Sequence, residues 1–137
     1  MNPRWIGILL IVAGIVMLIF SLSGGSSTVN PGEECILRIG QSVSVEGKNL
    51  KITFAAVSGD SRCPADALCI QAGEVTCRMK IEQDGEDTYT EFAYPGLTSD
   101  YSRLTYQGNN YRFKVEPSPY SDKQIADSEY RLFLIVN

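Results

Sequence analysis

The pattern of apolar and polar residues divides the chain into two parts. Residues 6–22 form an apolar run of 17 residues without a charged side chain. A helix of this length is at the short end of what crosses a hydrocarbon core of about 30 Å. Trp5 stands where an interfacial aromatic anchor is expected. We therefore predict one N-terminal transmembrane helix, a signal-anchor over residues 1–23 that meets the membrane through residues 5–23.

The charges that flank the apolar run predict its orientation. Arg4 is the only charged side chain before it, and Glu33 and Glu34 are the first after it. Since positive charge favours the cytoplasmic side, we expect a single-pass protein of the cell membrane with a cytoplasmic N-terminus. The rest of the chain then lies in the periplasm or at the cell surface. The alternative is a signal peptide cleaved after Ser23, which would release a secreted domain.

The apolar period changes to two beyond a Gly- and Ser-rich segment, which we interpret as a flexible linker over residues 24–34. Turn signals at 46–49, 84–86 and 107–110 separate the alternating runs. Strands are expected at 35–39, 42–46, 49–58, 73–83, 87–94, 102–107 with 110–116, and 129–136, with one helical turn at 64–68. The pattern predicts an all-β domain over residues 35–137, an antiparallel β-sandwich or small barrel of about seven strands.

Composition and charge exclude several function classes. The 12 Lys and Arg residues are outnumbered by 16 Asp and Glu, for a net charge of −4. No basic run is present, so we expect no nucleic-acid partner. Histidine is absent, which excludes His-based triads and His-containing zinc sites. Without a G-x-S-x-G context for any serine, the sequence predicts no enzyme, no catalytic residue and no cofactor.

All four cysteines follow the apolar run, in a compartment where disulfides form. Four cysteines allow three pairings. Only five residues separate Cys63 from Cys69, a loop that closes easily, and that pairing leaves Cys35 for Cys77. We predict these two disulfides. The Cys-x5-Cys spacing does not match a redox Cys-x-x-Cys motif or a four-thiolate zinc site, so no metal is expected.

A conspicuous motif surrounds the first cysteine pair. Residues 60–73 read DSRCPADALCIQAG. This stretch resembles the D-S-R-C-P-x4-C-x-W-A-G motif of small exported bacterial proteins that mostly have no assigned function. Gln71 stands where the motif has tryptophan. The resemblance implies a Cys63–Cys69 disulfide and an extracytoplasmic β-domain, and it implies no chemistry.

The polar residues of this motif admit a structural and a functional interpretation. Asp60, Ser61, Arg62 and Asp66 are candidates for structuring the loop through side-chain-to-backbone bonds. The functional alternative is a cation or polar-ligand site that uses Asp60, Asp66 and Glu74, although the tight acidic spacing of a calcium loop is absent. A further alternative makes Arg62 the specificity residue of a protease-inhibitor loop.

The tyrosines form a second set of candidates. All seven follow residue 88, and Tyr94, Tyr101, Tyr106 and Tyr120 lie in or beside expected loops. They either pack under those loops or form an aromatic cluster that grips a sugar, a peptide or a partner subunit. Together the patterns favour a non-enzymatic, membrane-anchored binding or accessory module with a protein partner, for which a small single-pass subunit of a larger membrane complex is one form. The alternative is a secreted ligand-binding or protease-inhibitor-like β-domain.

Overall fold

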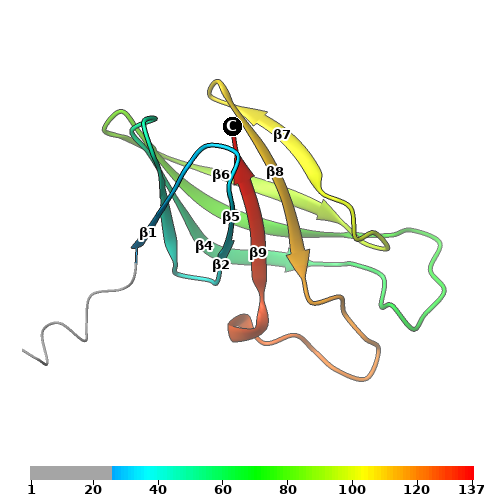
Figure 1. The fold of residues 1–137 in the computed structure, drawn as a ribbon. Helices are drawn as coiled ribbons and strands as arrows, with labels where there is room; N and C mark the ends of the chain where they lie inside the picture. Colours follow the sequence, from blue (N-terminus) through cyan, green and yellow to red (C-terminus); the bar gives the residue numbers. More distant parts are fainter. Residues whose placement is uncertain (1–25) are drawn as a thin grey trace, which may run out of the picture.

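The computed structural model describes residues 26–137, which form two β-sheets that face each other (Figure 1). The first sheet has the strand order β1-β3-β4-β5-β6 and the second has the order β2-β9-β8-β7. The strands are β1 (Ser26–Val29), β2 (Glu34–Leu37), β3 (Ser42–Val45), β4 (Leu50–Asp60), β5 (Glu74–Gln83), β6 (Glu86–Pro95), β7 (Ser102–Tyr106), β8 (Asn109–Glu116) and β9 (Arg131–Val136). The predicted all-β fold is confirmed, and the two separate sheets match the sandwich alternative.

Side-chain alternation explains why these segments form strands around one core. On β5, Val75, Cys77, Met79 and Ile81 point inward and are fully buried, while the residues between them face outward. The inner faces of both sheets contribute to one apolar cluster. Phe92 on β6 joins the layers, because its ring centroid lies 5.2 Å from that of Tyr111 and 4.9 Å from that of Phe113 on β8.

The predicted linker over 24–34 is wrong for the part that the structure describes. Ser26–Val29 form β1, which pairs with β3 in parallel, whereas all the other strand pairs are antiparallel. The backbone N–H of Gly32 then donates to the carbonyl of Val136. A polar strand at a sheet edge needs no apolar alternation, because backbone pairing is enough to hold it. The composition of this segment therefore did not reveal the strand.

Two helical predictions have different outcomes. The expected helical turn at 64–68 is a tight turn without a helix, in which the N–H of Ala67 donates to the carbonyl of Pro64. The predicted anchor at 1–23 lies outside the described residues. Within 26–137 the structure contains the short 3₁₀ helix η1 (Asp127–Glu129) and no helix with the length and apolar character of a membrane span.

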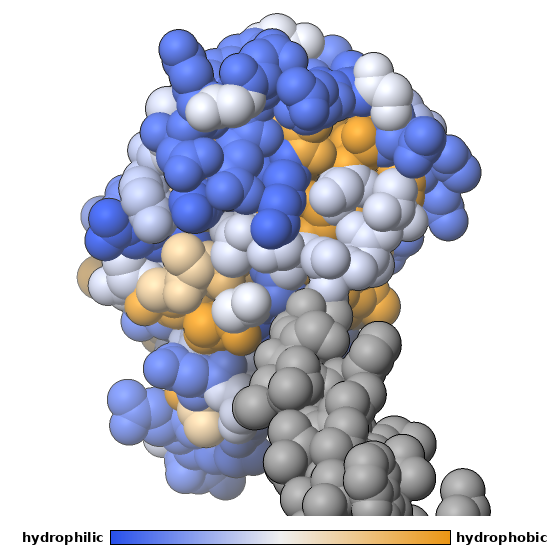
Figure 2. Space-filling view, turned by 90° about the vertical axis from the view of Figure 1, so that its left-hand side faces the viewer, coloured by the Kyte–Doolittle hydropathy of each residue, from blue (hydrophilic) through white to orange (hydrophobic). Residues whose placement is uncertain are grey.

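The surface differs from the core in character. Figure 2 shows the side of the molecule on which β1 lies, where hydrophilic residues predominate and apolar residues are visible in the spaces between them.

The loops on the opposite side of the molecule connect β4 to β5, β6 to β7 and β8 to β9 (Figure 1). The β4–β5 loop contains the motif with the first cysteine pair, so the fold presents this motif at one end of the two sheets.

The contacts of Phe92 predict that removing its ring strongly destabilises the fold. We expect Phe92→Ala to lower the free energy of unfolding by about 3–5 kcal/mol, since it removes a fully buried ring that joins the two sheets. Urea unfolding followed by circular dichroism measures this change. Tyr89→Ala is the matched control, because Tyr89 lies on the same strand with its side chain exposed. Equal losses for both variants would contradict this account of the core.

Candidate functional site

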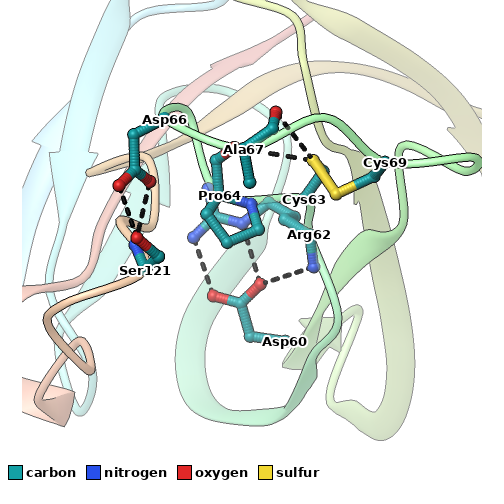
Figure 3. The surroundings of a disulfide bond; sticks show 8 residues. All are labelled: Asp60, Arg62, Cys63, Pro64, Asp66, Ala67, Cys69 and Ser121. Atoms are coloured by element: carbon teal, nitrogen blue, oxygen red, sulfur yellow. Dashed lines mark hydrogen bonds and ion pairs between the residues drawn. A yellow bond between two sulfur atoms is a disulfide. The ribbon is translucent and has the colours of Figure 1, made fainter.

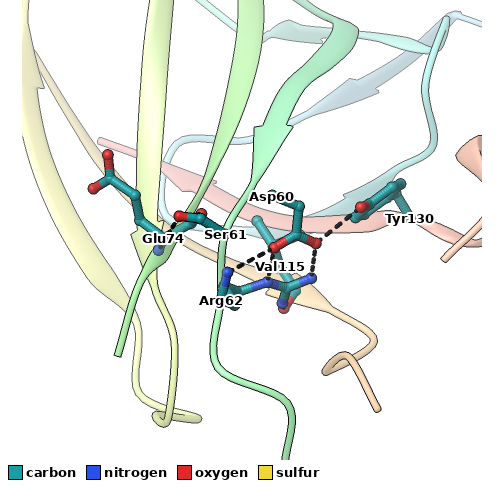
Figure 4. Close-up of polar contacts among 6 residues, drawn as sticks. All are labelled: Asp60, Ser61, Arg62, Glu74, Val115 and Tyr130. Atoms are coloured by element: carbon teal, nitrogen blue, oxygen red, sulfur yellow. Dashed lines mark hydrogen bonds and ion pairs between the residues drawn. The ribbon is translucent and has the colours of Figure 1, made fainter. Parts of the chain in front are cut away.

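The polar motif residues Asp60 and Arg62 form an ion pair at the end of β4, in which the Arg62 side chain is buried and the Asp60 side chain is partly exposed (Figure 4). Arg62 Nε donates to Asp60 Oδ1 at 2.9 Å, and Arg62 Nη2 donates to Oδ2 at 2.8 Å. The backbone N–H of Arg62 also donates to Oδ1 at 3.2 Å. The Arg62 side chain is only 3% exposed. Its charge is therefore neutralised by a two-pronged contact, the geometry in which a guanidinium binds a carboxylate most strongly.

This ion pair also connects the two sheets. Tyr130, which immediately precedes β9, donates its hydroxyl to Asp60 Oδ2 at 2.9 Å. Arg62 Nη1 donates to the carbonyl of Val115 on β8 at 3.4 Å. Asp60 belongs to the first sheet, whereas Tyr130 and Val115 adjoin or belong to the second. The group thus closes one end of the two-sheet core.

The environment sets the protonation states of both acids in this group. Burial alone would raise the pKa of Asp60, but hydrogen bonds from Arg62 and Tyr130 and the charge of Arg62 hold it below its ordinary value of 3.8. Burial, followed by the hydrogen bond to Asp60, raises the pKa of Tyr130 to about 12. At neutral pH Asp60 is charged and Tyr130 is protonated. A carboxylate with a lowered pKa and several donors is a poor general base, so this geometry supports the structural interpretation.

The alternative role of Arg62, as the exposed specificity residue of an inhibitor loop, is wrong because the side chain is buried. The exposed large apolar residues of this loop are the pair on either side of Cys69. Leu68 and Ile70 have exposed fractions of 105% and 104%. The sequence signal was two aliphatic residues within a short connection, where polar residues are usual, and it was not recognised.

The predicted Cys63–Cys69 disulfide is confirmed (Figure 3). Its Cα atoms lie 6.0 Å apart, and the bridge closes a ring over residues 63–69, with Leu68 inside the ring and Ile70 directly after it. Asp66 anchors the same loop to the β8–β9 connection. It accepts hydrogen bonds from the Ser121 hydroxyl and, at 2.9 Å, from the Ser121 backbone N–H. These two bonds lower the pKa of Asp66.

Two glycines allow the loop to pack closely against its neighbours. Gly73 adopts a φ of +68°, and a Cβ there would lie 1.9 Å from the carbonyl oxygen of Ser61. A Cβ on Gly96 would lie 2.2 Å from the carbonyl oxygen of Ala72. A side chain cannot occupy either position without displacing backbone atoms. The loop between β4 and β5 is therefore held against the loop between β6 and β7.

The remaining motif residues bind backbone groups within the loop. The Ser61 hydroxyl donates to the carbonyl of Glu74 at 3.1 Å and accepts the Glu74 N–H at 3.2 Å (Figure 4). These bonds continue the pairing of β4 with β5. The structure does not gather Asp60, Asp66 and Glu74 as cation ligands: within residues 26–137 no cluster of three or more potential metal ligands is present.

The four candidate tyrosines occupy different settings. Tyr94 is buried in the core, and its hydroxyl hydrogen is shared between the carbonyls of Thr98 at 3.2 Å and Asp100 at 3.0 Å. Tyr101 donates to Glu34 at 2.9 Å across the second sheet. Tyr106 packs partly against the core, and Tyr120 is exposed. Among the described residues, none of the aromatic contacts joins two of these tyrosines.

The second predicted disulfide, Cys35–Cys77, is wrong: both thiols are free. Cys35 lies on β2, at the edge of the second sheet, beside Leu134. Cys77 lies on β5, second from the far edge of the first sheet. The predicted pairing of Cys35 with Cys77 rested on their being the two remaining cysteines, and the sequence gives no measure of the distance between their strands. Burial, the main cause for both thiols, raises the pKa of Cys35 to about 11 and that of Cys77 to about 12.

The two free thiols lead to a chemical prediction. We expect the unfolded, unreduced chain to react with two equivalents of a thiol reagent, and the folded chain at pH 8 to react far more slowly. The reason is that both thiols, of which Cys77 is buried and Cys35 half-buried, stay protonated well above pH 8, and the thiolate is the reactive form. Mass spectrometry after alkylation measures the count. A fully oxidised chain without free thiols would restore the original pairing.

The Asp60–Arg62 pair predicts both a mutational and a pH effect. We expect Asp60→Asn to lower the free energy of unfolding by about 3 kcal/mol or more, since it leaves a buried guanidinium without its counter-charge. Asp66→Asn, on the exposed loop, is the control and should cost much less. The pKa of Asp60 is lower in the folded chain than its ordinary value of 3.8. The Asp60 carboxylate therefore contributes its full stabilisation of the fold above pH 3.8, and this stabilisation is lost as the pH falls through the pKa of the folded state.

Urea unfolding as a function of pH tests both effects together. Wild type should lose stability below pH 3.8 more steeply than Asp60→Asn, which has no carboxylate to protonate at this position. Parallel pH profiles for the two proteins would show that Asp60 does not stabilise the fold through its charge.

Comparisons with known proteins do not add to this geometry. No protein-family model, curated protein or solved structure matches the chain. The function must therefore be inferred from the arrangement of the residues themselves.

Proposed function

We propose that the chain is a non-enzymatic binding module that is anchored by residues 5–23 at the outer face of the cell membrane. The loop over residues 63–72 binds a protein partner there, as an accessory subunit would. The observation that carries this proposal is the full exposure of Leu68 and Ile70, the two neighbours of the disulfide-bonded Cys69. When a partner removes these exposed aliphatic side chains from water, their burial lowers the free energy of the complex.

The rigidity of the loop supports a binding role. The disulfide, the Asp66–Ser121 bonds and the close approach at Gly73 hold the loop in one arrangement. A loop that is ordered before binding loses less conformational entropy in a complex. Arg62 and Asp60 bind each other at the end of β4, whereas Leu68 and Ile70 extend into solvent.

Position and charge favour a protein over the bilayer as the ligand of the exposed tip at Leu68 and Ile70. The start of β1, where residues 1–25 join, lies on the side of the domain remote from the β4–β5 loop (Figure 1). Exposed acids accompany the tip and the neighbouring loops, namely Asp66, Asp100 and Asp122. An apolar cleft rimmed by Lys or Arg complements this surface, whereas an anionic lipid surface repels it.

Site-specific crosslinking tests the proposal in the producing cell. A photo-reactive residue at position 68 in the full chain should crosslink to one membrane or envelope protein. The same residue at Glu91, exposed on the free edge strand β6, is the control and should not. With that partner purified, Leu68→Asp and Ile70→Asp should each weaken binding about tenfold or more, while Glu91→Gln binds as wild type does.

Two results would contradict the proposal. If Leu68→Asp and Ile70→Asp both bound the partner with wild-type affinity, the loop would not be part of the interface. An intact mass of the cell-derived protein that begins near Gly24 would contradict the anchor and favour the secreted alternative, in which the same loop would bind a soluble partner.

A further inference from the structure

The outer face of the second sheet carries an excess of positive charge in an otherwise acidic chain. Its outward-facing cations are Arg103 on β7, Arg112 and Lys114 on β8, and Arg131 on β9, against the acids Glu34 on β2 and Glu116 on β8. The whole chain has a net charge of −4. The face is therefore locally opposite in sign to the rest of the molecule.

Both acids of this face already have partners. Glu116 lies 3.4 Å from Lys114 Nζ and 3.8 Å from Arg131 Nη2. Glu34 accepts the hydroxyl of Tyr101 at 2.9 Å. Within residues 26–137, the guanidinium groups of Arg103 and Arg112 have neither an ion pair nor a hydrogen bond. These two charges are the ones that the fold leaves uncompensated.

The two arginines are also direct neighbours. They are register partners in the antiparallel pair of β7 and β8, and both alternate outward from core residues. Like charges directly opposite each other destabilise a sheet. An arrangement that opposes folding and has no compensation within the described domain is typical of a site that binds an oppositely charged ligand.

A hollow of about 340 Å³ lies at this pair. Besides the two arginines, its polar lining comprises Thr105, Asn110 and Asn137, and Leu104 and Tyr111 complete it. Thr105 donates its hydroxyl to Asn110 Oδ1 at 2.9 Å, so the amide oxygen is occupied and the amide N–H₂ group remains a donor. The lining thus combines two guanidinium forks with a free amide donor, and it has room for a small anion.

We propose that Arg103 and Arg112 form a binding site for a phosphate group. Each planar guanidinium donates to two oxygens of a tetrahedral oxyanion, and two such forks neutralise a dianion. The phosphate can belong to a lipid headgroup or to a free phosphate ion, since both present the same oxygens. This site lies on the sheet face and is separate from the exposed tip at Leu68 and Ile70.

The test uses the full chain with inorganic phosphate as the probe. Binding is followed by the NMR signals of the arginine Nε–H groups, with sodium chloride added to match ionic strength. We expect phosphate to shift the signals of Arg103 and Arg112. Arg103→Gln and Arg112→Gln should each weaken phosphate binding about tenfold or more. Arg78→Gln is the matched control, because Arg78 lies on the outer face of the first sheet, over the ring of Tyr89.

Thermal unfolding supplies an independent readout. In chloride, each of the two glutamine variants should be at least as stable as wild type, because the like-charge repulsion is gone. Phosphate should raise the unfolding temperature of wild type and Arg78→Gln more than that of Arg103→Gln or Arg112→Gln. An equal rise in all four proteins would reflect the general stabilising effect of this salt and would overturn the proposal.

Lipid nanodiscs distinguish the two phosphate sources. The full chain is placed in phosphatidylcholine discs with and without phosphatidic acid. A shift of the Arg103 and Arg112 signals that requires phosphatidic acid identifies a lipid headgroup as the ligand. A shift with inorganic phosphate alone identifies a soluble phosphate. No shift with either probe rejects the site.

Discussion

The burial of the Arg62 guanidinium is the constraint on which the motif-bearing end of the molecule depends. A buried charge without a partner costs several kcal/mol, so the chain must bring compensating groups to it. Asp60 supplies both carboxylate oxygens, and Tyr130 holds that carboxylate from the segment entering the second sheet. Val115 adds a carbonyl from β8. These contacts need both sheets in their final positions, so the pair links closure of the core to placement of the loop.

The β4–β5 loop that follows this pair exposes large apolar side chains beside its polar ones. Surface loops usually present polar side chains to water, but here the charged side chains of Asp60 and Arg62 turn inward. The aliphatic side chains of Leu68 and Ile70 point to solvent. The disulfide and the close backbone contacts at Gly73 and Gly96 keep this arrangement from relaxing. The result is a rigid apolar tip, a feature that a partner can use and that isolated stability does not require.

The molecule carries two surfaces of different chemistry. The loop end combines aliphatic residues with acids such as Asp66, whereas the outer face of the second sheet brings Arg103 and Arg112 together. Since opposite local charges attract different ligands, we propose a protein with a basic rim for one surface and a phosphate group for the other. They lie on different parts of the fold, so a single chain has room for both ligands.

The sequence by itself determined the features that depend on neighbouring residues. Alternation along residues 75–81 predicted both the strand and its buried face, and the short spacing of Cys63 and Cys69 predicted their bridge. Only the tertiary structure decided the features that depend on which strands pair. It separated Cys35 from Cys77 into different sheets, placed the polar strand β1 beside β3, and set Arg103 opposite Arg112. The physical reason is that side-chain period records which face of a strand is buried, whereas strand partners are chosen by packing between segments distant in the chain.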